Sequence, residues 1–358
     1  MSITQTEVLI IGGGLTGLTL GYLLQQKNMD FKVLEARERL GGRISTQSYE
    51  EAKPLEMGAT WLGKKHHHLN DLLETLGVGI FEQALGESAI YEAISTSPPQ
   101  LVTLAPNTNP SFRVQGGTYS LIDALQKKIP SEQIHTGQVV QYIQQTPNGF
   151  VVKTDKDTFH ASFVVSTLPP FLLVNSIDIQ PVLPNDVLQL ANQTHTWMGE
   201  SIKVGLTYAQ PFWREKNTSG TIMSNVGPIP EMYDHSNYED SFFALKGFLN
   251  GAYFSVSKEQ RIQMVLKQLS KYYGEAANNY LSYEETVWRN EPFTFKPYAE
   301  HILPHQNNGH PAYHQAYLSG KFFIAGAETA PSFPGYMDGA VQSAFFVSEQ
   351  ILEKKGNQ

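Results

Sequence analysis

The stretch EVLIIGGGLTGLTLGYLLQQKNMDFKVLEARERLGGR, from Glu7 to Arg43, contains one complete nucleotide-binding pattern. Residues 7–11 form a short apolar run typical of a buried strand, and residues 15–26 have apolar side chains at helical spacing. Residues 31–34 predict a second strand, and Glu35 follows it directly. A strand, glycine turn, helix, strand and acidic residue in this order predict a βαβ unit that binds a dinucleotide.

Three glycines of the turn, Gly12, Gly14 and Gly17, have separate roles in such a unit. The first permits the tight turn, the second lets backbone approach a pyrophosphate, and the third lets the helix pack close to the strand. The helix N-terminus then offers free N–H groups and the positive end of its dipole to the phosphates. Glu35 is placed to accept hydrogen bonds from a ribose diol. A GxGxxG motif alone is weak evidence, but this structural context makes it strong.

The motif continues beyond the second strand as E-A-R-x-x-x-G-G-R, with Arg37, Gly41, Gly42 and Arg43. This pattern resembles the N-terminal signature of FAD enzymes of the glutathione-reductase type, and especially that of the flavin amine oxidases. The resemblance implies that FAD is the cofactor. The FAD contacts that it implies are Gly12, Gly14, Leu15, Thr16, Gly17, Glu35, Ala36, Arg37, Gly42, Arg43, Gly58, Ala59, Thr60, Val140, Gly326, Glu328 and Met337.

Composition sets the outer bounds. The 358 residues, 41% hydrophobic and 17% charged, are enough for two domains and a large core. The net charge of −8 and the lack of a Lys/Arg run argue against a nucleic-acid partner. The chain has no cysteine, which excludes disulfides, thiolate catalysis and a flavin attached through cysteine sulfur. Without a signal segment or an apolar stretch of roughly 20 residues, we expect a cytoplasmic protein with no membrane span.

The run KKHHH, from Lys64 to His68, has residue types found in metal sites but not their spacing. Three consecutive histidines cannot all face one ion from a helix, and no Asp or Glu lies at ligand spacing nearby. Leucines continue from this run as an apolar stripe up to Gly77. We therefore expect a solvated helix start, with Gly77 ending the helix, and no metal site.

The segment LEMGATWLG, from Leu55 to Gly63, contains small residues that would let its backbone lie flat against a planar ring. In the flavin amine oxidases the matching stretch passes beside the isoalloxazine, which is why Gly58, Ala59 and Thr60 are included among the FAD contacts. Trp61 could face the substrate or pack in the core, and we favour the core.

The segment SIKVGLTYAQPFW, from Ser201 to Trp213, predicts a strand with Lys203 and Ile202 on opposite faces. A lysine on a half-buried strand ordinarily faces solvent. However, G-E-S-I-K-V followed by Y-A-Q-P-F-W resembles the flavin monoamine oxidases, and the resemblance implies that Lys203 holds a water beside flavin N5. We prefer the functional interpretation.

Two C-terminal motifs extend the resemblance. WRNEPFTFKPY, ending at Tyr298, and GAETAPSFPGYMDGAV, which contains Tyr336, are similar to the flavin-proximal motifs of the family. They imply that Tyr298 and Tyr336 form a cage of two tyrosines. Pro297 stands where membrane-bound relatives carry the cysteine that binds flavin covalently, so we expect noncovalent FAD.

One region departs from the family pattern. Between Gly77 and Gln115 a typical monoamine oxidase has a much longer helical insertion, which supplies a large part of its substrate cavity. We therefore expect a truncated substrate domain with a more open site, or a homo-oligomer or partner protein that covers it.

These observations predict an α/β protein of two domains. A doubly wound, Rossmann-like FAD domain of the glutathione-reductase type is assigned to residues 1–79, 113–191 and 290–358. A discontinuous α+β substrate domain is assigned to residues 80–112 and 192–289. The flavin ring is expected where the two domains meet.

The function that the resemblance implies is amine oxidation. A neutral amine would lie between Tyr298 and Tyr336, a hydride would pass from its α carbon to flavin N5, and water would hydrolyse the imine. O2 would then reoxidise the flavin to give H2O2, assisted by Lys203. One alternative is an FAD-dependent desaturase or dehydrogenase of a bulky carbon skeleton, against which the paired tyrosines count. The other is a non-catalytic FAD-binding protein with a protein partner.

Overall fold

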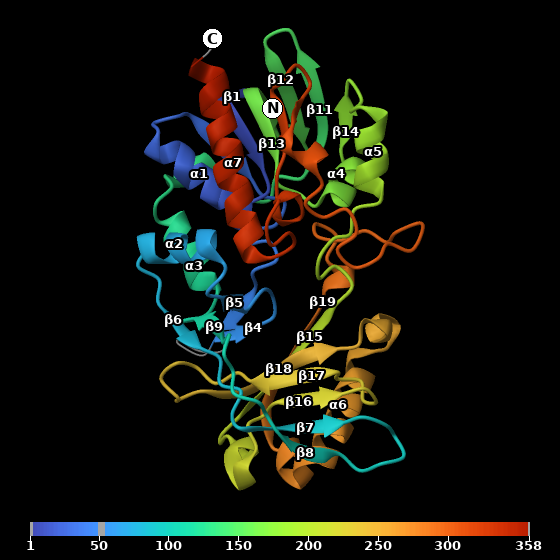
Figure 1. Cartoon of the computed structure of the whole chain (residues 1–358). Coiled ribbons are helices and arrows are strands. Elements are labelled where there is room, and N and C mark those ends of the chain that lie inside the picture. The colour runs from blue at the N-terminus through green and yellow to red at the C-terminus, as the bar shows by residue number, and fades with distance from the viewer. Residues whose placement is uncertain (1–2, 49–53, 357–358) are drawn as a thin grey trace.

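The computed structural model describes residues 3–48 and 54–356. Figure 1 shows two lobes, each built on one large sheet, with β1 and the C-terminal helix α7 (Met337–Gly356) both in the first lobe. Within these two residue ranges no helix is both long enough and apolar enough to cross a bilayer. In the same ranges no group of three or more His, Cys, Asp or Glu side chains is arranged to hold a metal ion.

The first sheet is mostly parallel and has the order β10-β2-β1-β13-β12-β11-β14, with β21 also beside β13 and β20 beside β21. Its strands are β1 (Ile3–Ile11), β2 (Phe31–Leu34), β10 (Ile134–His135), β11 (Val140–Thr146), β12 (Gly149–Thr154), β13 (Thr158–Ser166), β14 (Asp178–Gln180), β20 (Ala316–Tyr317) and β21 (Phe322–Ile324). In the centre, Ile10 of β1 lies opposite Val33 of β2 and Val165 of β13.

Both faces of this sheet are covered, which the alternation along β1 explains. Val8 and Ile10 belong to one core cluster, whereas Leu9 and Ile11 belong to another. The helices that contribute to the first cluster are α1 (Leu15–Gln26), α2 (His67–Thr75), α3 (Tyr119–Gln126) and α7. Those of the second are α4 (Pro170–Ser176) and α5 (Asn185–Asn192). A parallel sheet buried on both faces is the doubly wound α/β fold, so the predicted fold class is confirmed.

The second lobe is an α+β layer with the strand order β19-β15-β18-β17-β16-β7-β8. Its elements are β7 (Ser88–Glu92), β8 (Gln100–Thr103), β15 (Ile202–Tyr208), β16 (Ile222–Ser224), β17 (Glu231–Asp234), β18 (Phe243–Leu249), α6 (Lys258–Tyr273) and β19 (Tyr280–Val287). Val265 and Leu269 of α6 pack with Val204 of β15 in its core. Two segments far apart in the chain therefore share one sheet.

Short elements lie between the lobes and along the loops (Figure 1). Two small sheets contain β3 (Thr46–Ser48) with β4 (Pro54–Glu56), and β5 (Leu62–Gly63) and β6 (Ile80–Glu82) on either side of β9 (Ser111–Val114). The 3-10 turns are η1 (Ser131–Gln133), η2 (Phe212–Asn217), η3 (Gly251–Ser255), η4 (Gly274–Asn278), η5 (Trp288–Asn290), η6 (Pro311–His314) and η7 (Ala327–Thr329).

The helix expected after the KKHHH run is confirmed. It is α2, which begins at His67, buries Leu69, Leu72 and Leu73, and is followed by Gly77 with φ of +68°. His66 precedes it, and its ring Nδ1 accepts a hydrogen bond of 3.2 Å from the Gly63 backbone. The His66 side chain therefore closes the turn between residues 63 and 66 that leads into α2.

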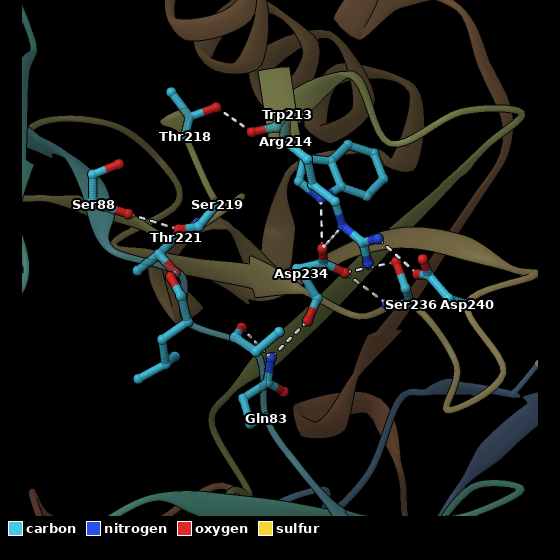
Figure 2. Close-up of polar contacts among 12 residues, drawn as sticks. Gln83, Ser88, Trp213, Arg214, Thr218, Ser219, Thr221, Asp234, Ser236 and Asp240 are labelled. Carbon is cyan, nitrogen blue, oxygen red and sulfur yellow. Dashed lines mark hydrogen bonds and ion pairs between the residues drawn. The ribbon is translucent and has the colours of Figure 1, made fainter. Parts of the chain in front are cut away.

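A buried polar network around Asp234 joins Gln83, in the loop between β6 and β7, to the second sheet (Figure 2). The Asp234 carboxylate, 2% exposed, accepts hydrogen bonds from Trp213 Nε1 at 2.9 Å and Arg214 Nε at 2.7 Å. Gln83 Nε2 donates to the Asp234 backbone carbonyl at 2.7 Å. The side-chain donors pair the buried carboxylate, as its burial requires, and the Gln83 amide separately ties residue 83 to the backbone of β17.

Candidate active site

A cavity of about 550 Å³ extends from the glycine turn of the first lobe to β15 of the second. Gly12, Gly14 and Glu35 line one part of it, and Lys203 and Tyr336 also line it. Both lobes thus contribute walls, as the sequence-based architecture requires for a ring at the domain junction.

The glycine turn has the geometry of a phosphate cradle. A Cβ on Gly17 would lie 1.9 Å from the Gly12 carbonyl oxygen, so this position requires glycine for close helix packing. Gly12 has φ of +109°, and a Cβ there would lie 2.4 Å from Thr167 Oγ1. A Cβ on Gly14, in contrast, would meet no protein atom closer than 3.8 Å. The space beside Gly14 therefore belongs to the cavity, where a bound ligand would occupy it.

The N-terminus of α1 is open toward the cavity. Its N-cap residue is Gly14, which has no side chain to cap the helix, and its first turn contains no acidic residue. Leu15 and Thr16 line the cavity. Uncapped backbone N–H groups at a helix N-terminus bind phosphate oxygens, so this end fits the pyrophosphate of FAD.

Glu35 lies at the end of β2 and is 4% exposed. Its carboxylate accepts hydrogen bonds from Gly13 N at 2.8 Å and Arg37 N at 2.9 Å, and the residue lines the cavity. The Arg37 side chain is held in turn by Glu291 Oε2 at 2.9 Å and Thr294 Oγ1 at 2.9 Å. The carboxylate is thereby oriented, and a carboxylate oxygen with remaining lone pairs suits a ribose diol.

Lys203 and Lys246 are fully buried at the end of the cavity formed by the second lobe, with exposures of 1% and 0%. Lys203 lines the cavity, and its Nζ donates to the Gly58 carbonyl. Burial lowers the pKa of Lys203 to about 8. Sequence reasoning identified Lys203 but missed Lys246, although strand alternation in β18 places Lys246 and Phe248 on one face.

Trp61 faces the cavity, so the core assignment favoured from sequence was wrong. Its indole Nε1 donates to Gln83 Oε1 at 2.9 Å, and Gln83 is anchored by the Asp234 network of Figure 2. The Nζ atoms of Lys203 and Lys246 lie 5.5 Å and 4.2 Å from the centroid of the Trp61 ring. The aromatic wall of the cavity at Trp61 is therefore held by a hydrogen bond from Trp61 to Gln83 on one side and by contact with the two lysine amines on another.

The structure does not bring Tyr298 and Tyr336 together around the cavity. Tyr336 lines it and is 40% exposed, but Tyr298 is absent from its walls. The Tyr298 ring packs against Phe171 and Phe295 at centroid distances of 4.8 Å and 5.1 Å, and its hydroxyl accepts a hydrogen bond from Thr196 N. The predicted cage of two tyrosines is thus not present, because aromatic neighbours and a backbone donor hold Tyr298 elsewhere.

Trp197 lies beside Tyr336. The ring centroids of Trp197 and Tyr336 are 5.7 Å apart, and His305 stacks on Trp197 at 4.2 Å. Trp197 and Met198 line the cavity. No motif in the sequence indicated them, since they precede β15 in an irregular segment.

Several predicted residues line the cavity and others lie behind it. The predicted residues that line it are Gly12, Gly14, Leu15, Thr16, Glu35, Ala36, Arg37, Gly42, Arg43, Ala59, Thr60, Val140, Lys203, Tyr336 and Met337. The predicted residues that do not line it are Gly17, Gly58, Tyr298, Gly326 and Glu328. Gly17 permits helix packing, Gly58 accepts from Lys203, and Glu328 binds Arg43, so these three act through neighbours. Gly326 has φ of +134° and forms the turn after β21.

Comparison with known proteins agrees with this geometry. The family model "Flavin containing amine oxidoreductase" matches residues 81–352, and the model "NAD(P)-binding Rossmann-like domain" matches residues 10–76. The chain therefore belongs to the flavin-containing amine oxidoreductase family. It is an oxidoreductase, and its cofactor is FAD.

The relatives cover nearly the whole chain. A probable flavin-containing monoamine oxidase A of Dictyostelium discoideum is 25% identical over 453 residues, covering 98% of both chains. The flavin-containing amine oxidase B of Homo sapiens is 23% identical, covering 98% of this chain and 87% of the relative. The first alignment is longer than this chain of 358 residues, so that relative carries additional residues.

Solved structures show the same fold. A putrescine oxidase bound to putrescine has a TM-score of 0.85 at 22% identity, covering 98% of this chain and 100% of the other. Cyclohexylamine oxidase from Brevibacterium oxydans IH-35A has a TM-score of 0.86 at 18% identity, covering 98% and 99%.

Proposed function

We propose that this protein oxidises an amine with FAD and passes the electrons to O2, forming H2O2. The observation that carries the proposal is the position of Lys203, a fully buried lysine that opens onto the aromatic part of a cavity continuous with the nucleotide cradle. Bound FAD would supply the redox chemistry, taking a hydride equivalent from the carbon next to the amine nitrogen and later giving up two electrons.

The aromatic side chains position the substrate. Trp61, Phe248, Trp197 and Tyr336 contribute ring surfaces to the cavity. Such surfaces exclude water, and their ring faces attract the amine nitrogen of the substrate. The substrate carbon bonded to that nitrogen is thereby held in a defined place. This set replaces the tyrosine pair expected from sequence.

Lys203 holds a proton at the cavity wall. With a pKa of about 8, its side chain is charged at neutral pH and readily exchanges that proton. One N–H is directed to Gly58 O, which leaves other N–H groups for a water in the cavity. We propose that this lysine assists electron transfer to O2 by stabilising negative charge on the reduced oxygen.

The charges of the cavity point to a monoamine with an apolar substituent. Among the described residues that line it, Glu35 is the one acidic residue, and its carboxylate binds the backbone of Gly13 and Arg37. The described residues around Trp61 and Tyr336 therefore offer no carboxylate to pair with a second ammonium group, and leaving that charge unpaired would be unfavourable. A diamine such as the putrescine bound by the structural neighbour should be a poor substrate.

The test is an anaerobic absorbance titration of the purified yellow protein with aromatic and aliphatic monoamines and with diamines, followed by air. We expect monoamines to bleach the flavin and air to restore the oxidised spectrum. One H2O2 should form for each flavin that is reoxidised. Bleaching without rapid return in air would replace O2 by another acceptor. Bleaching by diamines alone would overturn the substrate class, and no bleaching by any amine would overturn the proposed activity.

A further inference from the structure

Two lysines lie side by side beneath the aromatic wall, and only one of them lines the cavity. Lys203 of β15 pairs with Phe248 of β18, and Lys246 pairs with Gly205. This register places both lysine side chains on the same face of the sheet, in diagonal neighbour positions. Lys203 is among the residues that line the cavity, whereas Lys246 is not.

Both lysine Nζ atoms bind one short loop, residues 58–60. Lys203 Nζ donates to Gly58 O and Lys246 Nζ donates to Thr60 Oγ1. The Thr60 hydroxyl donates in turn to Gly58 O at 3.0 Å. Lys246 therefore supports the wall formed by Thr60 and Trp61 from behind, while Lys203 reaches the cavity itself.

Two full positive charges are unfavourable at this depth. Apart from the hydrogen bond between the two amines, their hydrogen-bond partners within the described ranges are a carbonyl and a hydroxyl, and neither Nζ atom forms an ion pair there. The titratable groups that face the pair are Glu56 of β4, Glu231 of β17, Arg113 of β9 and His235 after β17.

The one buried carboxylate among these groups is already engaged. Glu56 is 3% exposed, and its oxygens accept hydrogen bonds from Thr118 N at 2.6 Å and Thr46 Oγ1 at 2.9 Å. Adjacent ammonium groups without a carboxylate in contact titrate as a coupled pair, and the second proton is strongly disfavoured.

We propose that Lys246 is a positioning residue that stays a neutral amine, accepts a hydrogen bond from the Lys203 ammonium and so keeps the single proton of the pair on the lysine that faces the cavity. The pKa directions agree with this geometry. Burial lowers the pKa of Lys203, and the side-chain hydrogen bond with Lys246 partly opposes that effect. Burial, followed by the charge of Lys203, holds the pKa of Lys246 well below its ordinary value. The inference rests on the proposed function in one respect only, which is the assistance that the Lys203 proton gives to electron transfer to O2.

The direct test is a pH titration of the FAD-loaded protein labelled with 13C at the lysine ε carbons, followed by NMR. Lys203→Met and Lys246→Met assign the two resonances. We expect Lys246 to keep the chemical shift of a neutral amine from about pH 6 to about pH 9, and Lys203 to titrate with a midpoint of about 8.

Two variants of Lys246 separate hydrogen-bond acceptance from simple packing. Met has a similar length and no acceptor, so Lys246→Met should lower the Lys203 midpoint by about one pH unit. Gln offers an amide oxygen, so Lys246→Gln should leave the midpoint near that of the wild type. A residue that only fills space would give the same shift in both variants.

Three results would overturn the proposal: a charged Lys246 at neutral pH, a Lys203 midpoint that rises in Lys246→Met, or equal shifts in the Met and Gln variants. If one of the two Met variants fails to fold, the other still assigns one resonance, and the remaining lysine resonance with a shifted titration in the wild type belongs to the second lysine of the pair. Because the NMR titration requires no amine turnover, failure of this inference is distinguishable from failure of the proposed function.

Discussion

Arg43 Nη2 lies 2.8 Å from Oε2 of Glu328, a residue 285 positions further along the chain. Glu328 is 0% exposed, and its Oε1 also accepts a hydrogen bond of 3.1 Å from Trp197 N. Arg43 donates to the Trp197 carbonyl at 2.9 Å and lines the cavity. One ion pair thus joins the loop after β2, the turn after β21 and the segment that carries Trp197.

We expect Glu328→Gln to lower the free energy of unfolding by about 3 kcal/mol, because it removes the counter-charge of the partly buried Arg43 guanidinium at a site where Glu328 itself is fully buried. FAD retention should fall as well, since Arg43 lines the cavity. Urea unfolding and flavin absorbance after gel filtration measure the two effects. The control is Glu7→Gln, which removes an exposed pair with Lys355 and should change stability by less than about 1 kcal/mol. Equal losses in both variants would contradict the role given to the buried pair.

Gly14→Ala and Gly17→Ala should separate cofactor binding from folding. A Cβ at position 14 meets no protein atom within 3.8 Å, so the variant should fold with near wild-type stability but bind FAD weakly. A Cβ at position 17 would lie 1.9 Å from Gly12 O, so that variant should lose about 2 kcal/mol or more of stability. Flavin content and unfolding curves of the two proteins provide the measurement. Full FAD retention by Gly14→Ala would show that the pyrophosphate does not lie beside Gly14.

Lys203 should make stability depend on alkaline pH. Its pKa is about 8 in the folded protein against an ordinary 10.5, so the unfolded chain binds more protons between these values. Stability contributed by this group therefore rises with pH across that window, by up to about 3 kcal/mol. Unfolding measured from about pH 7 to about pH 10 should show this rise in the wild type relative to Lys203→Met. A pH-independent difference between the two proteins would argue that Lys203 keeps an ordinary pKa.

Tyr336→Leu and Tyr298→Leu form a matched pair. Tyr336 lines the cavity, so losing its ring should slow flavin reduction by a monoamine about 10-fold. Tyr298 is held by Phe171, Phe295 and Thr196 N, so its loss should lower stability and leave the reduction rate per bound FAD nearly unchanged. The measurement is the stopped-flow rate of flavin reduction by a monoamine in each variant, normalised to its FAD content. If Tyr298→Leu slows reduction as much as Tyr336→Leu, the tyrosine cage forms when the ligands bind.

Local chemistry made the nucleotide-binding half predictable. The positive φ of Gly12, the helix packing at Gly17 and the alternation of β1 side chains between two core clusters all follow from residues close together in the chain. Strand alternation likewise predicted that Lys203 lies on the face of β15 opposite to Ile202 and Val204, which pack in the core of the second lobe. These features depend on short-range sterics and on a period of two residues, which the sequence alone contains.

Only the tertiary structure placed Lys246 beside Lys203 and Trp197 beside Tyr336. The first pair depends on the register between β15 and β18, which is decided by packing between distant segments. The second depends on irregular segments, where contacts such as Glu328 to Trp197 N outweigh local preference. The sequence by itself therefore determined the family, the cofactor cradle and the lysine that faces the cavity. The aromatic wall and the partner of that lysine were decided by long-range packing and hydrogen bonding, because no local pattern encodes which distant side chains meet.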